Sequence, residues 1–178
     1  MLQTLPDEVL RLASSFMRRA WRVTLLLCAC AASPAPEDWL TFDPCQPLPV
    51  VLAPGTRSDE RARAMAGLEL WNEVLHPSLR VGDQASGPHL LLRFEDVAAA
   101  GFGHYDVITG EVLINARMDP AAQVITVAHE LGHAFGLRHV DARPSVMNSG
   151  NLDVMPTQED AAAVTALWGT CVWPSSGR

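Results

Sequence analysis

The residues of this chain with the clearest chemical meaning stand in one short string, HELGHAFGLRH, which begins at His129. His129 and His133 are four residues apart, so an α-helix would place both imidazoles on one face, where they can bind the same metal ion. A hydrolytic zinc site needs three protein ligands and one open position. Gly136 can take the left-handed backbone conformation that ends a helix, so the chain can turn back and bring His139 to the metal as the third ligand.

Glu130 is the residue of this string that could carry out bond cleavage. It lies about 100° around the helix from His129, so it is poorly placed as a ligand but can reach a water molecule in the open position. The pattern predicts one catalytic Zn²⁺ ion held by the three histidines, with Glu130 as the general base in hydrolysis of a peptide bond. Because imidazoles must be neutral to bind zinc, zinc occupancy and activity should both fall below about pH 6.

The string resembles the signature of the metzincin zinc peptidases, and within them the matrixins, the catalytic domains of matrix metalloproteinases. The sequence SVMN at 145–148 stands where that family has its Met-turn, whose methionine lies beneath the zinc. An ordinary methionine that fills a gap in the core is the alternative interpretation of Met147. The segment 156–169 resembles the C-terminal helix of matrixins, so the resemblance covers about residues 48–170. It implies an α+β fold of the zincin type, with a twisted mixed sheet of about five strands, three main helices and an active-site cleft above the zinc helix.

The chain also departs from the family pattern. Asn148 follows Met147, so the tyrosine that contacts the metal in several metzincins is absent, as it is in matrixins. Matrixins hold a structural zinc ion and calcium ions in a long loop, which shrinks here to about residues 106–110, the length of a simple hairpin. We therefore expect the catalytic zinc alone. His104 and Asp106 are either remnants of the accessory sites or ordinary hydrogen-bonded side chains.

The resemblance also implies how a substrate binds. In metzincins an edge strand above the zinc pairs antiparallel with an extended peptide, and the matching segment here is about 101–106. Residues after the Met-turn would form the wall of the specificity pocket beside the zinc. The candidate substrate-binding residues are Gly101, Phe102, Gly103, Asn148 and Ser149. The two glycines are equally explained by a relaxed backbone at a sheet edge.

The remaining sequence predicts the elements that position this site. Apolar and alternating runs predict strands at 48–53, 79–81, 89–94, 103–108 and 111–115, the last two joined as a hairpin. Ser58 caps a helix over 59–75, and Asp119 caps the zinc helix, which starts at Pro120. Thr157 caps the last helix, with Asp160 as its capping-box partner and Gly169 after its end.

Residues 1–32 are predicted to be an export signal. A basic stretch at 17–22 precedes an apolar run at 23–30 and several small residues. The run is too short to span a bilayer, and no other stretch of the chain is long enough. Acidic residues before Met17 suit a signal poorly, so we expect translation to start there; an amphipathic N-terminal helix is the alternative. The protein would then be extracellular or periplasmic. The sequence LCAC at 27–30 loosely resembles a bacterial lipobox, in which Cys30 would carry a lipid anchor.

Composition agrees with one exported enzyme domain. We assign 33–47 to a linker and N-terminal segment, 48–173 to the catalytic domain and 174–178 to a tail, which is enough chain for one core. Without the signal, Cys45 and Cys171 remain as an even pair in an oxidising compartment. A disulfide between them would stabilise the fold by about 3–5 kcal/mol. A cysteine switch at Cys45 is the alternative, but the motif around it does not match.

Charge narrows the class of partner. The chain has 20 acidic residues against 13 basic ones, and its net charge at pH 7 is −7. This argues against nucleic acid and against an anionic membrane surface as partners. We expect a monomer that acts as a secreted zinc endopeptidase on peptide or protein substrates. The alternatives are a catalytically silent secreted zinc-binding module and a zinc hydrolase of a non-peptide substrate.

Overall fold

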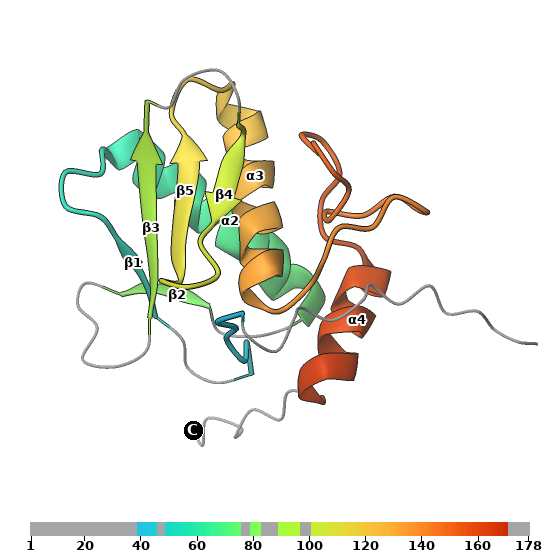
Figure 1. Cartoon of the computed structure of the whole chain (residues 1–178). Helices are drawn as coiled ribbons and strands as arrows, with labels where there is room; N and C mark the ends of the chain where they lie inside the picture. The colour runs from blue at the N-terminus through green and yellow to red at the C-terminus, as the bar shows by residue number, and fades with distance from the viewer. Residues whose placement is uncertain (1–38, 46–48, 76–78, 83–88, 97–100, 171–178) are drawn as a thin grey trace, which may run out of the picture.

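Five strands and three helices make up the part of the chain that this computed structural model describes, which is residues 39–45, 49–75, 79–82, 89–96 and 101–170 (Figure 1). In chain order they are β1 (Pro49–Leu52), α2 (Ser58–Leu75), β2 (Arg80–Gly82), β3 (Leu90–Glu95), β4 (Gly103–Tyr105), β5 (Glu111–Asn115), α3 (Pro120–Ala134) and α4 (Gln158–Trp168). The predicted mixture of five strands and three helices is thereby confirmed, and it is compatible with a zincin-like fold. The signal region, the lipobox and the tail lie outside the described residues, so the predicted domain boundaries stay predictions.

The sheet has the strand order β2-β1-β3-β5-β4, and β4 is the strand that runs against its neighbour. β1 pairs in parallel with β2 and β3, and β3 pairs in parallel with β5. The fully buried side chains of the three central strands are Val50, Leu90, Leu92, Val112 and Ile114. β4 is the last of the described strands in this order, so none of the described strands pairs with the outer side of its backbone.

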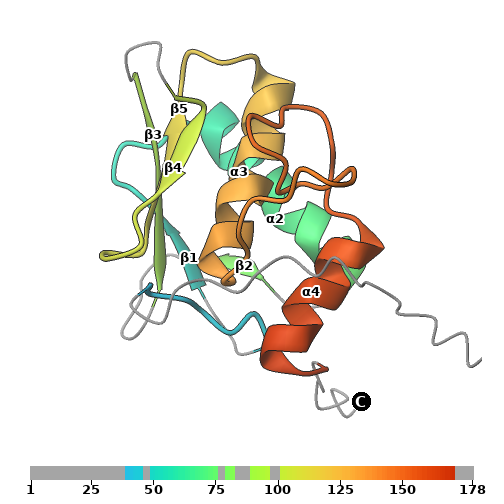
Figure 2. The same cartoon turned by 45° about the vertical axis from the view of Figure 1, so that its right-hand side comes forward.

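The helices lie on one side of the sheet, as Figures 1 and 2 both show. α2 packs closely against α3, because a Cβ atom on Gly67 would stand only 2.5 Å from Val127. Trp71 of α2 lies between them. Its indole N–H donates to the Ala128 carbonyl at 2.7 Å, and its ring packs edge-on against the Phe135 ring, with ring centres 5.4 Å apart. These buried contacts hold α3 in place from behind. None of the described helices is long and apolar enough to cross a membrane.

Both ends of α3 are set by the residues that the sequence indicated. The Asp119 side chain accepts a hydrogen bond from the Ala121 N–H at 2.9 Å, and Pro120 occupies the first turn. The helix ends at Ala134, and Gly136 then takes a φ of +93°, where its N–H donates to the His133 carbonyl. The predicted reversal of the chain at Gly136 is confirmed.

The hairpin between β4 and β5 turns earlier than predicted. β4 ends at Tyr105, because the Asp106 carboxylate accepts hydrogen bonds from the backbone N–H groups of Ile108 and Thr109 at 2.8 and 3.1 Å. These bonds lower the pKa of Asp106. Asp106 therefore closes a local turn. This is the role of an ordinary hydrogen-bonded side chain, the alternative to a remnant of an accessory metal site.

The predicted disulfide cannot be followed to both ends, because Cys171 lies outside the described residues. Cys45 is described, and its Sγ lies 3.9 Å from the carbonyl oxygen of Gly169, two residues before Cys171. The N-terminal segment is thus close to the end of α4, where the pairing would require it to be. The disulfide itself stays a prediction.

Candidate active site

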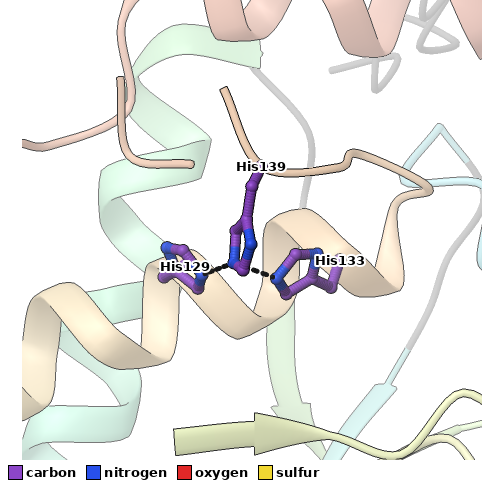
Figure 3. A group of neighbouring side chains, drawn as sticks. All are labelled: His129, His133 and His139. Carbon is purple, nitrogen blue, oxygen red and sulfur yellow. Dashed lines mark hydrogen bonds between the residues drawn. The ribbon is translucent and has the colours of Figure 1, made fainter. Parts of the chain in front are cut away.

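The three predicted zinc ligands converge on one point. Figure 3 shows His129 and His133 rising from the same face of α3, with His139 descending from the chain that returns after Gly136. The Nε2 atom of His139 lies 3.2 Å from Nε2 of His129 and 3.2 Å from Nε2 of His133. Among the residues that the structure describes, these three form a group of potential metal ligands whose ligand atoms all lie within 4.8 Å of one another.

Hydrogen bonds at the far side of two rings decide which nitrogen faces the metal. His129 Nδ1 lies 2.6 Å from the carbonyl oxygen of Val146, and His133 Nδ1 lies 2.8 Å from that of Leu137. A carbonyl oxygen only accepts, so Nδ1 carries the proton in each ring and Nε2 keeps a free lone pair. Backbone carbonyls thus orient both imidazoles, as is usual for histidines that bind a metal.

The geometry fits zinc. In a tetrahedral site with zinc–nitrogen bonds of about 2.0–2.1 Å, ligand nitrogens stand about 3.3–3.4 Å apart. The two measured Nε2–Nε2 distances of 3.2 Å are close to that spacing. Burial lowers the pKa of His129. Burial also lowers the pKa of His133, and with the nearby His129 ring it brings this pKa to about 4. Both rings are therefore neutral at pH 7, the state that binds a metal.

Glu130 lies beside this cluster and is almost completely buried, with 5% of its surface exposed. Burial raises the pKa of its carboxyl group to about 8, and a hydrogen bond from the Tyr105 backbone N–H opposes this shift. Glu130 therefore joins α3 to the edge strand β4. A carboxyl group whose pKa lies this close to neutrality can both take up and release a proton at pH 7.

Gly103 shows how closely β4 lies on α3. A Cβ atom at this position would stand 2.5 Å from Thr126 Cγ2 and 2.9 Å from Glu130 Oε1. Because real Cβ atoms do not approach so closely, no other residue fits here without moving Glu130 or Thr126. Gly103 therefore fixes the position of the carboxyl group relative to the sheet edge. Gly103 was expected either to bind substrate or to relax the backbone of a sheet edge, and nothing in the sequence indicated its contact with Glu130.

The Met-turn lies directly against the zinc helix. Met147 is fully buried, and a Cβ atom on Gly132 would overlap its sulfur atom and stand 3.3 Å from Trp71 Cζ2. The turn is closed by a hydrogen bond from Asn148 N–H to the Ser145 carbonyl at 3.1 Å. Both proposed roles of Met147 are compatible with this position, because it fills the core beside Gly132 and belongs to the turn whose Val146 carbonyl bonds to His129.

Asp160 connects the Met-turn to α4, which the sequence analysis did not foresee. Its carboxylate caps α4 in a capping box with Thr157, as predicted. It also accepts hydrogen bonds from the Ser145 hydroxyl at 2.6 Å and from the Val146 N–H at 3.1 Å. Burial alone would raise the pKa of Asp160, but hydrogen bonds from Ser145, Thr157 and Arg143 outweigh it and lower the pKa.

An open cleft of about 890 Å³ runs past the histidines. Its walls contain the predicted edge residues Gly101, Phe102 and Gly103, together with Glu130. On the opposite side Gly150 and Asn151 line the cleft. Neither Asn148 nor Ser149 belongs to the lining: the Asn148 amide donates to the carbonyls of Val140 and Arg143, and the Ser149 N–H donates to Asp141.

Asn115 supports the part of the cleft before β4. Its side-chain amide donates to the Gly101 carbonyl at 3.0 Å, and its backbone N–H donates to the Phe102 carbonyl at 3.0 Å. Phe102 is 47% exposed, and its ring lies near Gly150 on the other side of the cleft. A Cβ atom on Gly150 would stand 3.8 Å from Phe102 Cε2. Sequence reasoning missed Asn115, which carries no motif of its own.

Comparison with known families supports the metallopeptidase interpretation. Residues 85–164 match the family model of peptidase family M78, described as the IrrE N-terminal-like domain. This segment resembles a zincin-like metallopeptidase domain. The match runs from before β3 into α4 and so contains the three histidines and Glu130. It supports zinc as the metal and peptidase as the class, but it names the IrrE-like type and not the matrixin type. Comparison with curated proteins finds no match.

Proposed function

We propose that this protein is a zinc-dependent endopeptidase in which Glu130 is the general base. The observation that carries the proposal is the orientation of the site: two carbonyl-bonded imidazoles and His139 present their Nε2 atoms to one point beside a buried carboxyl group. The cleft above this point is bordered by a sheet edge, which suits an extended peptide. The match to the IrrE-like peptidases supports the same class.

The donor set determines what the metal would contribute. A zinc ion held by the three histidines would supply a Lewis acid that activates water and polarises the carbonyl of the bond to be cut. Glu130 takes the proton of the attacking water and returns it to the departing amine. Burial raises the pKa of Glu130, which makes its carboxylate a stronger proton acceptor than an exposed one, and the proton that it takes up can be released again near neutral pH.

The backbone of β4 would bind the substrate. Phe102 and Asp106 direct their backbone groups toward β5, since the Phe102 carbonyl accepts from Asn115 and the Asp106 N–H donates to Glu111. Successive residues of a strand point their backbone groups to alternate sides, so Gly103 and Tyr105 face outward over Glu130. The Tyr105 N–H already donates to Glu130, so an extended peptide could add to the sheet at the backbone of Gly103 and at the Tyr105 carbonyl, and present a peptide bond to the site.

Further parts of the proposal rest on the sequence alone. We infer export to an oxidising compartment from the basic and apolar segments before residue 33, with a lipid anchor at Cys30 as the alternative to free secretion. We infer a monomer with one catalytic zinc ion and a matrixin-like arrangement of substrate and Met-turn. The short hairpin that Asp106 closes supports the absence of a long metal-binding loop of the matrixin kind.

The Glu130→Gln variant tests the assignment of the base. The exchange removes the proton acceptor and keeps the shape of the side chain, so zinc content should match the wild type while peptide hydrolysis falls at least a hundredfold. Zinc is measured by elemental analysis, and hydrolysis by incubation with a mixed peptide library with and without a chelator. Near-wild-type hydrolysis would exclude Glu130 as the base. A zinc-loaded wild-type protein that cuts no peptide would favour the silent module or the non-peptide hydrolase.

A further inference from the structure

The N-terminal segment Trp39–Phe42 crosses one end of the cleft. The Leu40 N–H donates to the Val107 carbonyl at 2.8 Å, and the Tyr105 hydroxyl donates to the Leu40 carbonyl at 2.6 Å. The Trp39 ring stands edge-on to the zinc ligand His133, with ring centres 6.4 Å apart, and lines the cleft. This segment therefore lies where β4 ends, beside the metal site.

The segment is firmly held. The Phe42 N–H donates to the carbonyl of Ala134 at the end of α3, and the Phe42 side chain is 9% exposed and belongs to the core. Gly110, with a φ of +75°, packs beneath it, since a Cβ atom there would stand 3.0 Å from Leu40 and 3.1 Å from Phe42. Displacing it would break these hydrogen bonds and expose an apolar side chain to water. The segment is a wall of the cleft and not a loose flap.

The wall shortens the sheet edge that a peptide can use. The outward backbone groups of β4 come from alternate residues, Gly103 and Tyr105, and Val107 follows in the turn after the strand. The Val107 carbonyl is already taken by Leu40, which stands where the next residues of a bound peptide would pair. Glu130 lies under Gly103 and Tyr105, so the bond to be cut must lie opposite these two residues.

The direction of the peptide follows from strand geometry. Antiparallel pairing has hydrogen bonds perpendicular to the strands and is slightly more stable per residue than parallel pairing. A peptide antiparallel to β4 has its amino end toward Val107 and the wall. β4 offers strand pairing only from Gly103 to Tyr105, and the Val107 carbonyl beyond it is taken by Leu40, so about two residues of the peptide lie between the site and the wall.

We propose that Trp39 and Leu40 close the cleft on the amino side of the scissile bond, so that this protein cuts peptides close to their amino ends, after about the second residue. The proposal rests on the proposed peptidase function and narrows it from an endopeptidase in general to one that cuts near the amino end of a peptide. Peptides with a free amino end and few upstream residues are substrates, and bonds deep within a chain are poor ones.

Two measurements test this on the zinc-loaded protein. In the first, random decapeptides are digested and the cut positions are counted from the amino end by mass spectrometry. In the second, alanine peptides of one, two and five residues that end in a hydroxamate are titrated calorimetrically. The chelating group is at the carboxyl end, so every residue lies upstream of the metal, and binding is measured without any cleavage.

The variant is Trp39→Ala, which removes the ring that lines the cleft beside His133 and keeps the backbone bonds of Leu40. Ile108→Ala is the matched control, because Ile108 is 82% exposed in the neighbouring turn and does not line the cleft. In the wild type and the control, the five-residue hydroxamate should bind at least tenfold more weakly than the two-residue one. In Trp39→Ala this difference should shrink at least threefold, and cuts should spread to inner bonds of the decapeptides.

The outcomes are separable. Equal binding of the two- and five-residue hydroxamates to the wild type, or cuts spread evenly along the decapeptides, would refute the claim that Trp39 and Leu40 close the cleft. Length-dependent binding with no cleavage would uphold the wall and overturn the peptidase function. No binding of any hydroxamate would overturn both, and a preference for cuts near the carboxyl end would overturn the direction and with it the proposal.

Discussion

Replacing Gly103 by alanine should disable the site while leaving the zinc ligands in place. The added methyl group would stand 2.5 Å from Thr126 Cγ2, 2.9 Å from Glu130 Oε1 and 3.1 Å from Glu130 Cγ. Carbon atoms in contact stand about 3.5–4.0 Å apart, so something must move by about 1 Å. Thr126 is β-branched and lies within α3, where it is held in few rotamers. Glu130 and β4 must therefore give way.

The magnitude follows from this overlap. Overpacking by one methyl group costs about 1–3 kcal/mol, and this should appear as a lower melting temperature. A displacement of about 1 Å in a catalytic group costs about a hundredfold in rate. We therefore expect kcat/KM for peptide cleavage to fall about a hundredfold. Zinc content should stay at the wild-type level, because the hydrogen bonds that orient the histidines come from Val146 and Leu137 and not from β4.

A double variant separates the two contacts. Thr126→Ser removes Cγ2 and keeps the hydroxyl that donates to the Ala122 carbonyl. Gly103→Ala combined with Thr126→Ser should therefore regain stability, since one overlap is gone. It should not regain activity, since the overlap with Glu130 remains. Cleavage rates, melting curves and elemental analysis give the three readouts. Activity of Gly103→Ala within threefold of the wild type would refute the argument that β4 fixes Glu130.

Three further results are expected. Asp160→Asn should lower both the free energy of unfolding, by about 1–3 kcal/mol, and the affinity for zinc, because it weakens the charge-assisted hydrogen bonds to the Met-turn. Unchanged zinc affinity in a competition titration would contradict this. Met147→Ala should cost about 2–5 kcal/mol in chemical denaturation because the side chain is fully buried, whereas the control Met147→Leu should cost less than about 1.5 kcal/mol. In the zinc-free protein, the pKa of His133 is about 4 in the folded state and 6.5 in an ordinary environment. As the pH falls from 6.5 to 4, the unfolded chain therefore binds a proton that the folded protein does not, and the folded state loses stability. The melting temperature should fall across this pH range, and the slope should be smaller in His133→Gln; equal slopes would contradict the shift.

The zinc ligands could be predicted from the sequence because their geometry is local. Helical periodicity alone places His129 above His133, and only a glycine readily takes the φ of +93° that Gly136 needs to bring His139 back. The caps of α3 and α4 were predicted for the same reason, since each depends on residues one to three positions apart. Interactions between residues so close in sequence depend little on the rest of the chain, so their pattern can be read from the sequence alone.

The same locality explains why the match to the IrrE-like family model was not predicted. The zinc helix and the reversal after it account for the spacing of the three histidines in this chain, so the string indicates a zinc site and a hydrolytic reaction. Local geometry of this kind does not decide which peptidase family the surrounding chain resembles, and residues 85–164 match the IrrE-like family model. That distinction depends on the surrounding strands and loops, for which single positions carry little signal.

Contacts between distant segments could not be predicted. Trp39 meets His133, and Leu40 pairs with Val107, across long stretches of chain that carry no pattern linking them. Gly103 has the same limitation, because its fit against Glu130 arises only when β4 lies on α3. A glycine in a strand is a signal of close approach, but it does not name the partner.

Asp160 shows how one side chain can carry both kinds of information. Its place three residues after Thr157 predicts a capping box, and the carboxylate does cap α4. The same carboxylate accepts from the Val146 N–H, and the Val146 carbonyl accepts from His129 Nδ1. The backbone of Val146 therefore stands between Asp160 and His129, with its N–H bonded to the carboxylate and its carbonyl to the imidazole, so α4 helps to hold that imidazole. The helix that looks most remote from the chemistry is thus part of the support of the metal site, and changes on its buried face should alter zinc affinity before they alter the sheet.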